Sequence, residues 1–153
     1  MKYIIALIIL TFSLPAMAQD QFNPEGLWLT ENERSVIQVK SCKDNQEELC
    51  GKIHWIIEGG MQTDSKNPDP EKQGQPMCGL QIMSGLKPSE YKPNIWRGGK
   101  IYKADDGDMY DAKIEMLDEN KMKLRGFMGV SMFGKTQHWT RVSANQYKKC
   151  SAR

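Results

Sequence analysis

Polar and apolar residues alternate along most of the chain after residue 25, in short runs separated by Gly, Asn, Asp and Pro. This period of two, interrupted at regular intervals by turn residues, is typical of antiparallel β-strands. The pattern predicts eight strands, at residues 26–30, 35–42, 49–57, 79–84, 95–103, 109–117, 121–128 and 132–143. Because closure removes the unpaired edges of a sheet, we predict an all-β, antiparallel up-and-down barrel. A two-sheet β-sandwich is the alternative.

The same alternation predicts which side chains face the interior. The side chains expected inward are Ile37, Val39, Leu49, Ile53, Trp55, Tyr110, Ala112, Ile114, Met116, Met122, Leu124 and Met128. Those expected outward are Gln38, Lys40, Lys52, His54, Asp111, Lys113, Glu115, Lys123 and Arg125.

Two segments lack this alternation. Residues 58–77 contain Gly59-Gly60 and Asn67-Pro68-Asp69-Pro70 and almost nothing apolar, which predicts a long surface loop. Loops of more than roughly 12–15 residues are usually functional or disordered. Residues 86–94, with Pro88 and Pro93, are predicted to form a second loop.

The first 18 residues have the features of a signal peptide. Lys2 forms a basic start, residues 3–14 are apolar, and Pro15-Ala16-Met17-Ala18 ends in the small-x-small pattern of a cleavage site. The apolar run of about 12 residues is shorter than the roughly 20 that a membrane anchor needs. We therefore expect cleavage after Ala18 and a periplasmic or secreted protein in which residues 19–153 form a single domain.

Composition and charge exclude some partners. The net charge is only +2, and acidic and basic residues are interspersed, so we expect no nucleic-acid partner. No apolar run after residue 18 approaches membrane length, and we expect a monomer without a membrane span. The modest 39% hydrophobic share is enough for a small core but leaves less to line a large cavity.

The four cysteines all follow residue 18, and an even number in an exported chain indicates disulfides. Four cysteines allow three pairings, which their spacing alone does not decide. Strand parity places Cys42 and Cys50 on the outer side of one hairpin, where a bridge is geometrically reasonable. We therefore predict a Cys42–Cys50 disulfide and, by elimination, Cys78–Cys150.

An ordered series of short motifs resembles a known family. The motifs are Gly26-Leu27-Trp28, Leu49-Cys50-Gly51-Lys52-Ile53, Asn67-Pro68-Asp69-Pro70, Cys78-Gly79-Leu80, Gly98-Gly99-Lys100-Ile101-Tyr102, Asp106-Gly107-Asp108-Met109-Tyr110, Arg125-Gly126-Phe127-Met128-Gly129 and Phe133-Gly134-Lys135-Thr136-Gln137-His138-Trp139-Thr140-Arg141-Val142. Together they resemble the exported bacterial domain-of-unknown-function family 2147, over about residues 25–142. The resemblance implies a secreted domain without an established activity and provides no catalytic residues.

The first of these motifs is also similar to the Gly-x-Trp opening of lipocalin-type barrels. In those barrels an Arg from near the last strand covers the Trp of the first strand. The resemblance implies that Trp28 and Arg141 close one end of the barrel through a cation–π contact.

Candidate chemical sites are sparse. His54 and His138 are the only histidines and lack other ligands at metal spacing, so we expect surface or hydrogen-bonding roles for both. Asp105-Asp106-Gly107-Asp108 lacks the spaced ligands of a calcium loop and is predicted to be a hairpin turn. Asp64, Asn67 and Asp69 are a weaker oxygen-ligand candidate, and we expect no metal and no cofactor.

The second half of the chain is rich in methionine, at positions 83, 109, 116, 122, 128 and 132. We expect these side chains to fill the core, with a ligand pocket as the alternative. No nucleophile elbow, P-loop or dinucleotide motif is present in the sequence, which indicates a protein that is not an enzyme.

Two functions follow from the sequence. We predict a barrel that binds a small apolar or amphipathic molecule in the cell envelope. The alternative is a filled barrel that contacts an envelope protein through residues 58–77. An open apolar cavity favours the first function and a filled barrel favours the second.

Overall fold

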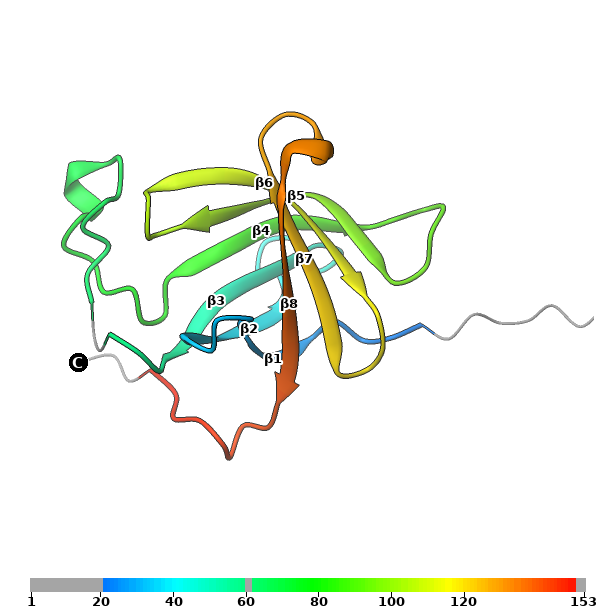
Figure 1. The fold of residues 1–153 in the computed structure, drawn as a ribbon, viewed down its shortest axis with the longest axis horizontal. Coiled ribbons are helices and arrows are strands. Elements are labelled where there is room, and N and C mark those ends of the chain that lie inside the picture. Colours follow the sequence, from blue (N-terminus) through cyan, green and yellow to red (C-terminus); the bar gives the residue numbers. More distant parts are fainter. Residues whose placement is uncertain (1–20, 60–61, 151–153) are drawn as a thin grey trace, which may run out of the picture.

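The eight strands form one closed barrel (Figure 1). This computed structural model describes residues 21–59 and 62–150, so the predicted signal peptide lies outside the described residues. Each strand pairs antiparallel with its neighbours in sequence, and β1 pairs with β8. The strands are β1 (Gly26–Leu29), β2 (Ser35–Ser41), β3 (Leu49–Ile56), β4 (Gln81–Pro88), β5 (Ile95–Lys103), β6 (Asp108–Met116), β7 (Lys121–Phe127) and β8 (Lys135–Val142).

The predicted up-and-down barrel is therefore confirmed. The only other elements in the described residues are two short 3-10 turns, η1 (Pro70–Lys72) and η2 (Ser131–Phe133). No helix in these ranges is long and apolar enough to cross a membrane. The core cluster lies inside the barrel and consists of Trp28, Ile37, Val39, Leu49, Ile53, Met83, Leu86, Trp96, Ala112, Ile114, Met116, Met122, Leu124 and Trp139.

Strand β4 differs from the prediction. The sequence pattern ends this strand at Ser84 and begins a loop at Leu86, but β4 continues to Pro88 and buries Leu86 completely. A Cβ atom on Gly99 of β5 would lie 2.5 Å from Cγ of Leu86, so glycine at position 99 makes room for this side chain. Gly85, with φ near +70°, therefore lies within a strand whose backbone closely approaches Gly99, and a sequence pattern does not distinguish such a glycine from one in a turn.

Strand β3 contains a bulge that changes which side chains face inward. Val36 pairs with Trp55 and Ile37 pairs with Ile53, so His54 is the extra residue. After the bulge Ile56 packs against the core, whereas Trp55 does not belong to the core cluster. The prediction of an inward Trp55 is therefore wrong, because a bulge shifts the alternation by one residue.

The end of β7 gives a second correction. The alternation predicts an inward Met128 in a strand at residues 121–128, but β7 ends at Phe127. Met128 is 57% exposed. The last strand likewise begins at Lys135 and not at Met132, because η2 lies between the two strands.

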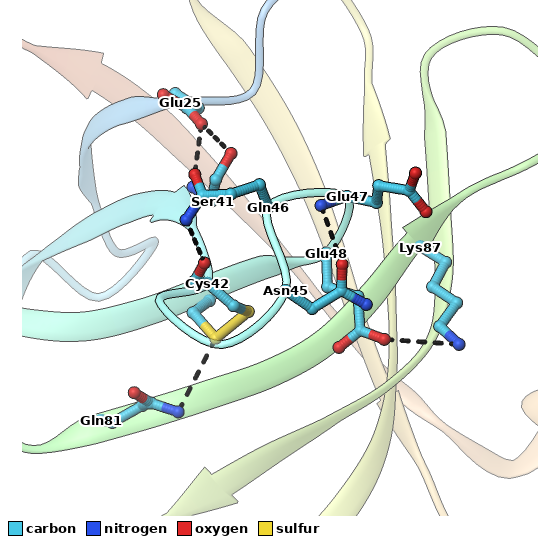
Figure 2. Close-up of a disulfide and its surroundings, with 10 residues drawn as sticks. Glu25, Ser41, Cys42, Asn45, Gln46, Glu47, Glu48, Gln81 and Lys87 are labelled. Atoms are coloured by element: carbon cyan, nitrogen blue, oxygen red, sulfur yellow. Dashed lines mark hydrogen bonds and ion pairs between the residues drawn. A yellow bond between two sulfur atoms is a disulfide. The ribbon is translucent and has the colours of Figure 1, made fainter.

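Both predicted disulfides are present. Cys42 and Cys50 join β2 to β3 with Cα atoms 4.9 Å apart, and Figure 2 shows this bridge beside the Gln81 side chain. Beside this hairpin Glu25 accepts hydrogen bonds from the Ser41 hydroxyl and amide, at 2.6 and 2.8 Å. Both bonds lower the pKa of Glu25, and the bond from the hydroxyl has the larger effect. Cys78 and Cys150 connect the C-terminal segment to the β3–β4 connection.

Candidate functional site

The two ends of the barrel differ, and one holds a cavity of about 560 Å³. The β1–β2, β3–β4, β5–β6 and β7–β8 connections contribute to its lining, because in an up-and-down barrel alternate connections lie at the same end. Four core residues, Ile37, Ile53, Leu124 and Trp139, also line the cavity. The rest of the core cluster lies outside it and fills the remainder of the barrel.

The cavity wall is mainly apolar, and at its mouth exposed polar side chains lie together with the exposed Met128 and Phe133. The apolar residues that line it are Ile37, Ile53, Ile56, Met77, Ile82, Ile101, Leu124, Phe127, Met128, Phe133 and Trp139. Polar lining residues include Thr30, Asn32, Arg34, Ser35, Glu58, Gln62, Lys103, Asp105, Tyr110, Lys135 and Gln137. An apolar cavity with a few polar groups is the usual composition of a small-molecule site, and its volume falls within the usual range of such sites.

The charged groups at the rim are largely paired. Arg34 contacts Asp105 at 3.4 Å and Glu58 at 4.0 Å. Lys103 forms an ion pair with Asp106, and this hydrogen bond raises the pKa of Lys103 and lowers that of Asp106. Lys135 also lines the cavity and forms no ion pair with any described residue.

A buried hydrogen bond attaches the β3–β4 connection to the barrel beside the cavity. The hydroxyl of Tyr102, on β5, donates to Oδ1 of Asp64 at 2.7 Å, and the Asp64 side chain is almost fully buried. Burial, and next the bond to Asp64, raise the pKa of Tyr102 to about 12. Oδ2 of Asp64 accepts from Asn67 at 2.7 Å and from Gln75 at 3.2 Å.

These contacts give Asp64 a structural role. Asp64, Asn67 and Asp69 are oxygen-ligand candidates by sequence, but in the structure Asn67 donates to Asp64, and Asp69 caps η1 through the amide of Glu71. The Tyr102–Asp64 pair is not predicted from the sequence, because it joins residues 38 apart. The sequence indicates this pair only through Asp64 itself, an acidic residue in a loop where polar and apolar residues do not alternate.

The opposite end is closed by the pair that the lipocalin resemblance implied. The guanidinium carbon of Arg141 lies 4.3 Å from the centre of the Trp28 ring, which is fully buried. Arg141 also donates to the carbonyl oxygens of Glu119, Glu25 and Asn23, at 2.6, 2.7 and 2.5 Å. The structure therefore brings Trp28 and Arg141 together away from the cavity.

The two histidines have different environments. His138 is more than half exposed, and its Nδ1 lies 3.4 Å from Glu31. His54 is only 7% exposed, so the expectation of a surface position is wrong, although His54 belongs neither to the core cluster nor to the cavity lining. The C-terminal segment passes beside it, because the amide of Cys150 donates to the His54 carbonyl at 2.7 Å. Nδ1 of His54 has no hydrogen-bond partner in the described part of the chain.

The methionines of the second half divide between the core and the surface. Met83, Met116 and Met122 are buried in the core, whereas Met109, Met128 and Met132 are exposed.

The aspartate-rich segment, residues 105–108, forms the turn between β5 and β6, as predicted, and its last residue, Asp108, is the first residue of β6. Within this turn Asp106 accepts hydrogen bonds from Lys103, Tyr110 and the amide of Asp108.

A barrel of eight antiparallel strands, closed at one end and hollow at the other, defines a lipocalin-like β-barrel protein. The fold is similar to that of protein HP1028 from the human pathogen Helicobacter pylori, which is described as belonging to the lipocalin family. The TM-score is 0.71, and the match covers 82% of this chain and 87% of that chain. At 18% sequence identity the likeness concerns the fold alone.

Residues 26–141 match the bacterial family DUF2147, whose description is "Uncharacterized protein conserved in bacteria". The chain therefore belongs to this family. No curated protein matches it. Two disulfides in a barrel of this kind fit an extracellular or periplasmic protein, since thiols stay reduced in the cytosol.

Proposed function

We propose that this protein is a non-catalytic binding module of the bacterial envelope that holds a small apolar or amphipathic molecule in its barrel. The observation that carries the proposal is the cavity of about 560 Å³ with apolar walls and polar side chains at its mouth. Burying the apolar part of a ligand there removes its surface from water, at roughly 25 cal/mol per Å². The rim then contacts the polar part of an amphipathic ligand.

The cavity favours this function over the alternative of a filled barrel. A filled barrel needs core side chains at both ends, but the cavity takes up the end at which Ile56, Ile82 and Ile101 form the wall. The packing of the β3–β4 connection against the cavity also supports the proposal. Met77 from this connection packs against the core and lines the cavity, and Asp64 is bound to the wall through Tyr102.

Gly126 offers a direct test because it lines the cavity without a side chain. A Cβ atom at this position would meet its nearest neighbours, in Ile101 and Tyr110, at ordinary distances of 3.6 and 3.8 Å. A Gly126→Leu side chain is therefore expected to enter the cavity while the barrel still closes. Gly74 lies in the β3–β4 connection, where a Cβ atom would have no neighbour within 4 Å, so Gly74→Leu is the matched control.

The experiment titrates the protein with N-phenyl-1-naphthylamine, an apolar dye that fluoresces when it leaves water. We expect saturable binding to the wild type and to Gly74→Leu, and affinity lower by about tenfold or more for Gly126→Leu, since each lost 1.4 kcal/mol is a factor of ten. Circular dichroism checks that each variant is folded. Equal dye binding by a folded Gly126→Leu variant, or no binding by the wild type, contradicts the proposal.

A further inference from the structure

The β7–β8 connection, residues 128–134, exposes an unusual number of apolar side chains at the mouth of the cavity. Met128 and Val130 are 57% and 58% exposed, and Met132 and Phe133 are 81% and 79% exposed. Single exposed apolar residues are normal on protein surfaces, but a group of them marks an interaction site. Figure 1 shows this connection projecting beyond the ends of β7 and β8.

The connection is held in this shape by hydrogen bonds and close packing. The guanidinium of Arg125 donates to the carbonyl oxygens of Ser131 and Met132, at 2.7 and 3.1 Å, and to the Thr136 hydroxyl at 2.7 Å. A Cβ atom on Gly134 would lie 2.5 Å from the carbonyl oxygen of Gly126, so glycine is needed where the chain returns to the barrel. The exposed side chains are thus presented by an ordered loop.

The charges around the loop favour an anionic surface. Residues 125–135 contain two cations, Arg125 and Lys135, and no acidic residue. Lys135 forms no ion pair among the described residues, whereas the rim acids Glu58 and Asp105 contact Arg34. An anionic bilayer attracts nearby cations, and its interface accepts apolar side chains.

The size and shape of the loop favour lipid over protein. A stable protein interface buries about 800 Å² on each partner, which corresponds to about 20–30 residues a side. Four apolar side chains on one projecting connection are far fewer. A fluid lipid interface needs no complementary groove, and it accepts a few apolar side chains together with nearby cations.

We propose that the β7–β8 connection is a docking loop that inserts its apolar side chains into the surface of an anionic lipid bilayer. Met128 and Phe133 belong both to this loop and to the lining of the cavity. Docking therefore brings the cavity mouth to the lipid, from which an apolar molecule enters without crossing water. The docking itself does not depend on the identity of the cavity ligand.

Co-sedimentation with vesicles tests the proposal. One set of vesicles is phosphatidylcholine, and the other contains equal parts of phosphatidylcholine and phosphatidylglycerol. The test variant is Val130→Ser/Met132→Ser, because neither residue lines the cavity. The control is Tyr91→Ser, since Tyr91 is 80% exposed in the β4–β5 connection at the opposite end. All proteins share the same N-terminus, so differences between them report on the substituted side chains.

We expect the wild type and Tyr91→Ser to bind the anionic vesicles, and the double variant to bind them about tenfold or more weakly. Lys135→Gln should lower binding to anionic vesicles about fivefold, with little change on phosphatidylcholine. The double variant should bind N-phenyl-1-naphthylamine in solution as the wild type does, which separates this inference from the proposed function.

Three results overturn the inference. The first is equal vesicle binding by the wild type and the double variant, and the second is no vesicle binding by the wild type. The third is concentration-dependent dimerisation of the wild type, seen by analytical ultracentrifugation and lost in the double variant, which makes the loop a contact between copies of this chain.

Discussion

Trp28 and Arg141 are direct cross-strand partners between β1 and β8, the pair of strands that closes the barrel. The guanidinium carbon lies 4.3 Å from the centre of the indole ring, and the indole nitrogen donates to the Pro24 carbonyl at 2.9 Å. One side chain of β8 thus covers the ring of β1 and also binds three carbonyl oxygens around it.

The first prediction concerns this pair. Trp28→Ala removes a fully buried ring and should lower the free energy of unfolding by roughly 3–5 kcal/mol. Arg141→Ala removes the cover and its hydrogen bonds and should lower it by a smaller amount, about 1–3 kcal/mol. Urea unfolding followed by tryptophan fluorescence or circular dichroism measures both. An unchanged unfolding midpoint for Trp28→Ala excludes a structural role for the ring.

The second prediction concerns Gly26, which lies two residues before Trp28. Gly26 has φ near +145°, and a Cβ atom there would overlap Nη1 of Arg141. Gly26→Ala should therefore lower stability by about 1–3 kcal/mol in the wild type. In the Arg141→Ala background the overlap is absent, so the same substitution should have a smaller effect. A double-mutant cycle measures the difference, and strict additivity contradicts the proposed reason for the glycine.

The third prediction concerns the link between Tyr102 and Asp64. Tyr102→Phe leaves Oδ1 of the buried Asp64 without this donor and should lower the free energy of unfolding by about 1–3 kcal/mol. Because the bond holds the β3–β4 connection, cleavage between residues 62 and 77 by a protease should also become faster. Tyr91→Phe, at an exposed side chain, is the control. The prediction fails if Tyr102→Phe and Tyr91→Phe are cleaved at the same rate.

The fourth prediction concerns pH. Burial, and next the charges of Lys149 and Lys52, lower the pKa of His54 in the folded protein. The unfolded chain then takes up a proton at a higher pH than the folded chain, near the ordinary value of about 6.5. The stability provided by neutral His54 should be fully present above about pH 6.5 and should decrease as the pH falls below it.

The corresponding measurement is the free energy of unfolding between pH 8 and pH 5, about one and a half units on either side of the ordinary histidine pKa. His54→Phe cannot take up this proton, so its stability should decline less than that of the wild type over the lower half of this range. Identical pH profiles for the two proteins show that the protonation of His54 does not contribute.

The strands and their topology could be predicted from the sequence because both depend on local patterns. Alternation over residues such as Ala112, Ile114 and Met116 indicates a strand and its inner face, and short turns between strands favour antiparallel neighbours. The Cys42–Cys50 pairing could be predicted in the same way, since strand parity within one hairpin places both thiols on the same side.

The predictions failed where one residue interrupts the alternation. The extra residue at His54 moves Trp55 out of the core cluster, and Gly85 lies inside β4 although its sequence context resembles the end of a strand. Each depends on a partner strand: on Val36 and Ile37 in the first case, and on the space above Gly99 in the second. A pattern within one strand contains no information about its neighbour.

The antiparallel barrel and the Cys42–Cys50 bridge could be inferred from the chain, because strand period and cysteine parity are properties of neighbouring residues, and elimination then left Cys78 to pair with Cys150. That one end is filled and the other holds a cavity emerges only from the folded barrel. Whether a barrel is hollow depends on how side chains from all of its strands fill a shared volume. No single strand's sequence sets that volume, and the Tyr102–Asp64 bond and the exposed β7–β8 connection likewise depend on the packing of distant segments.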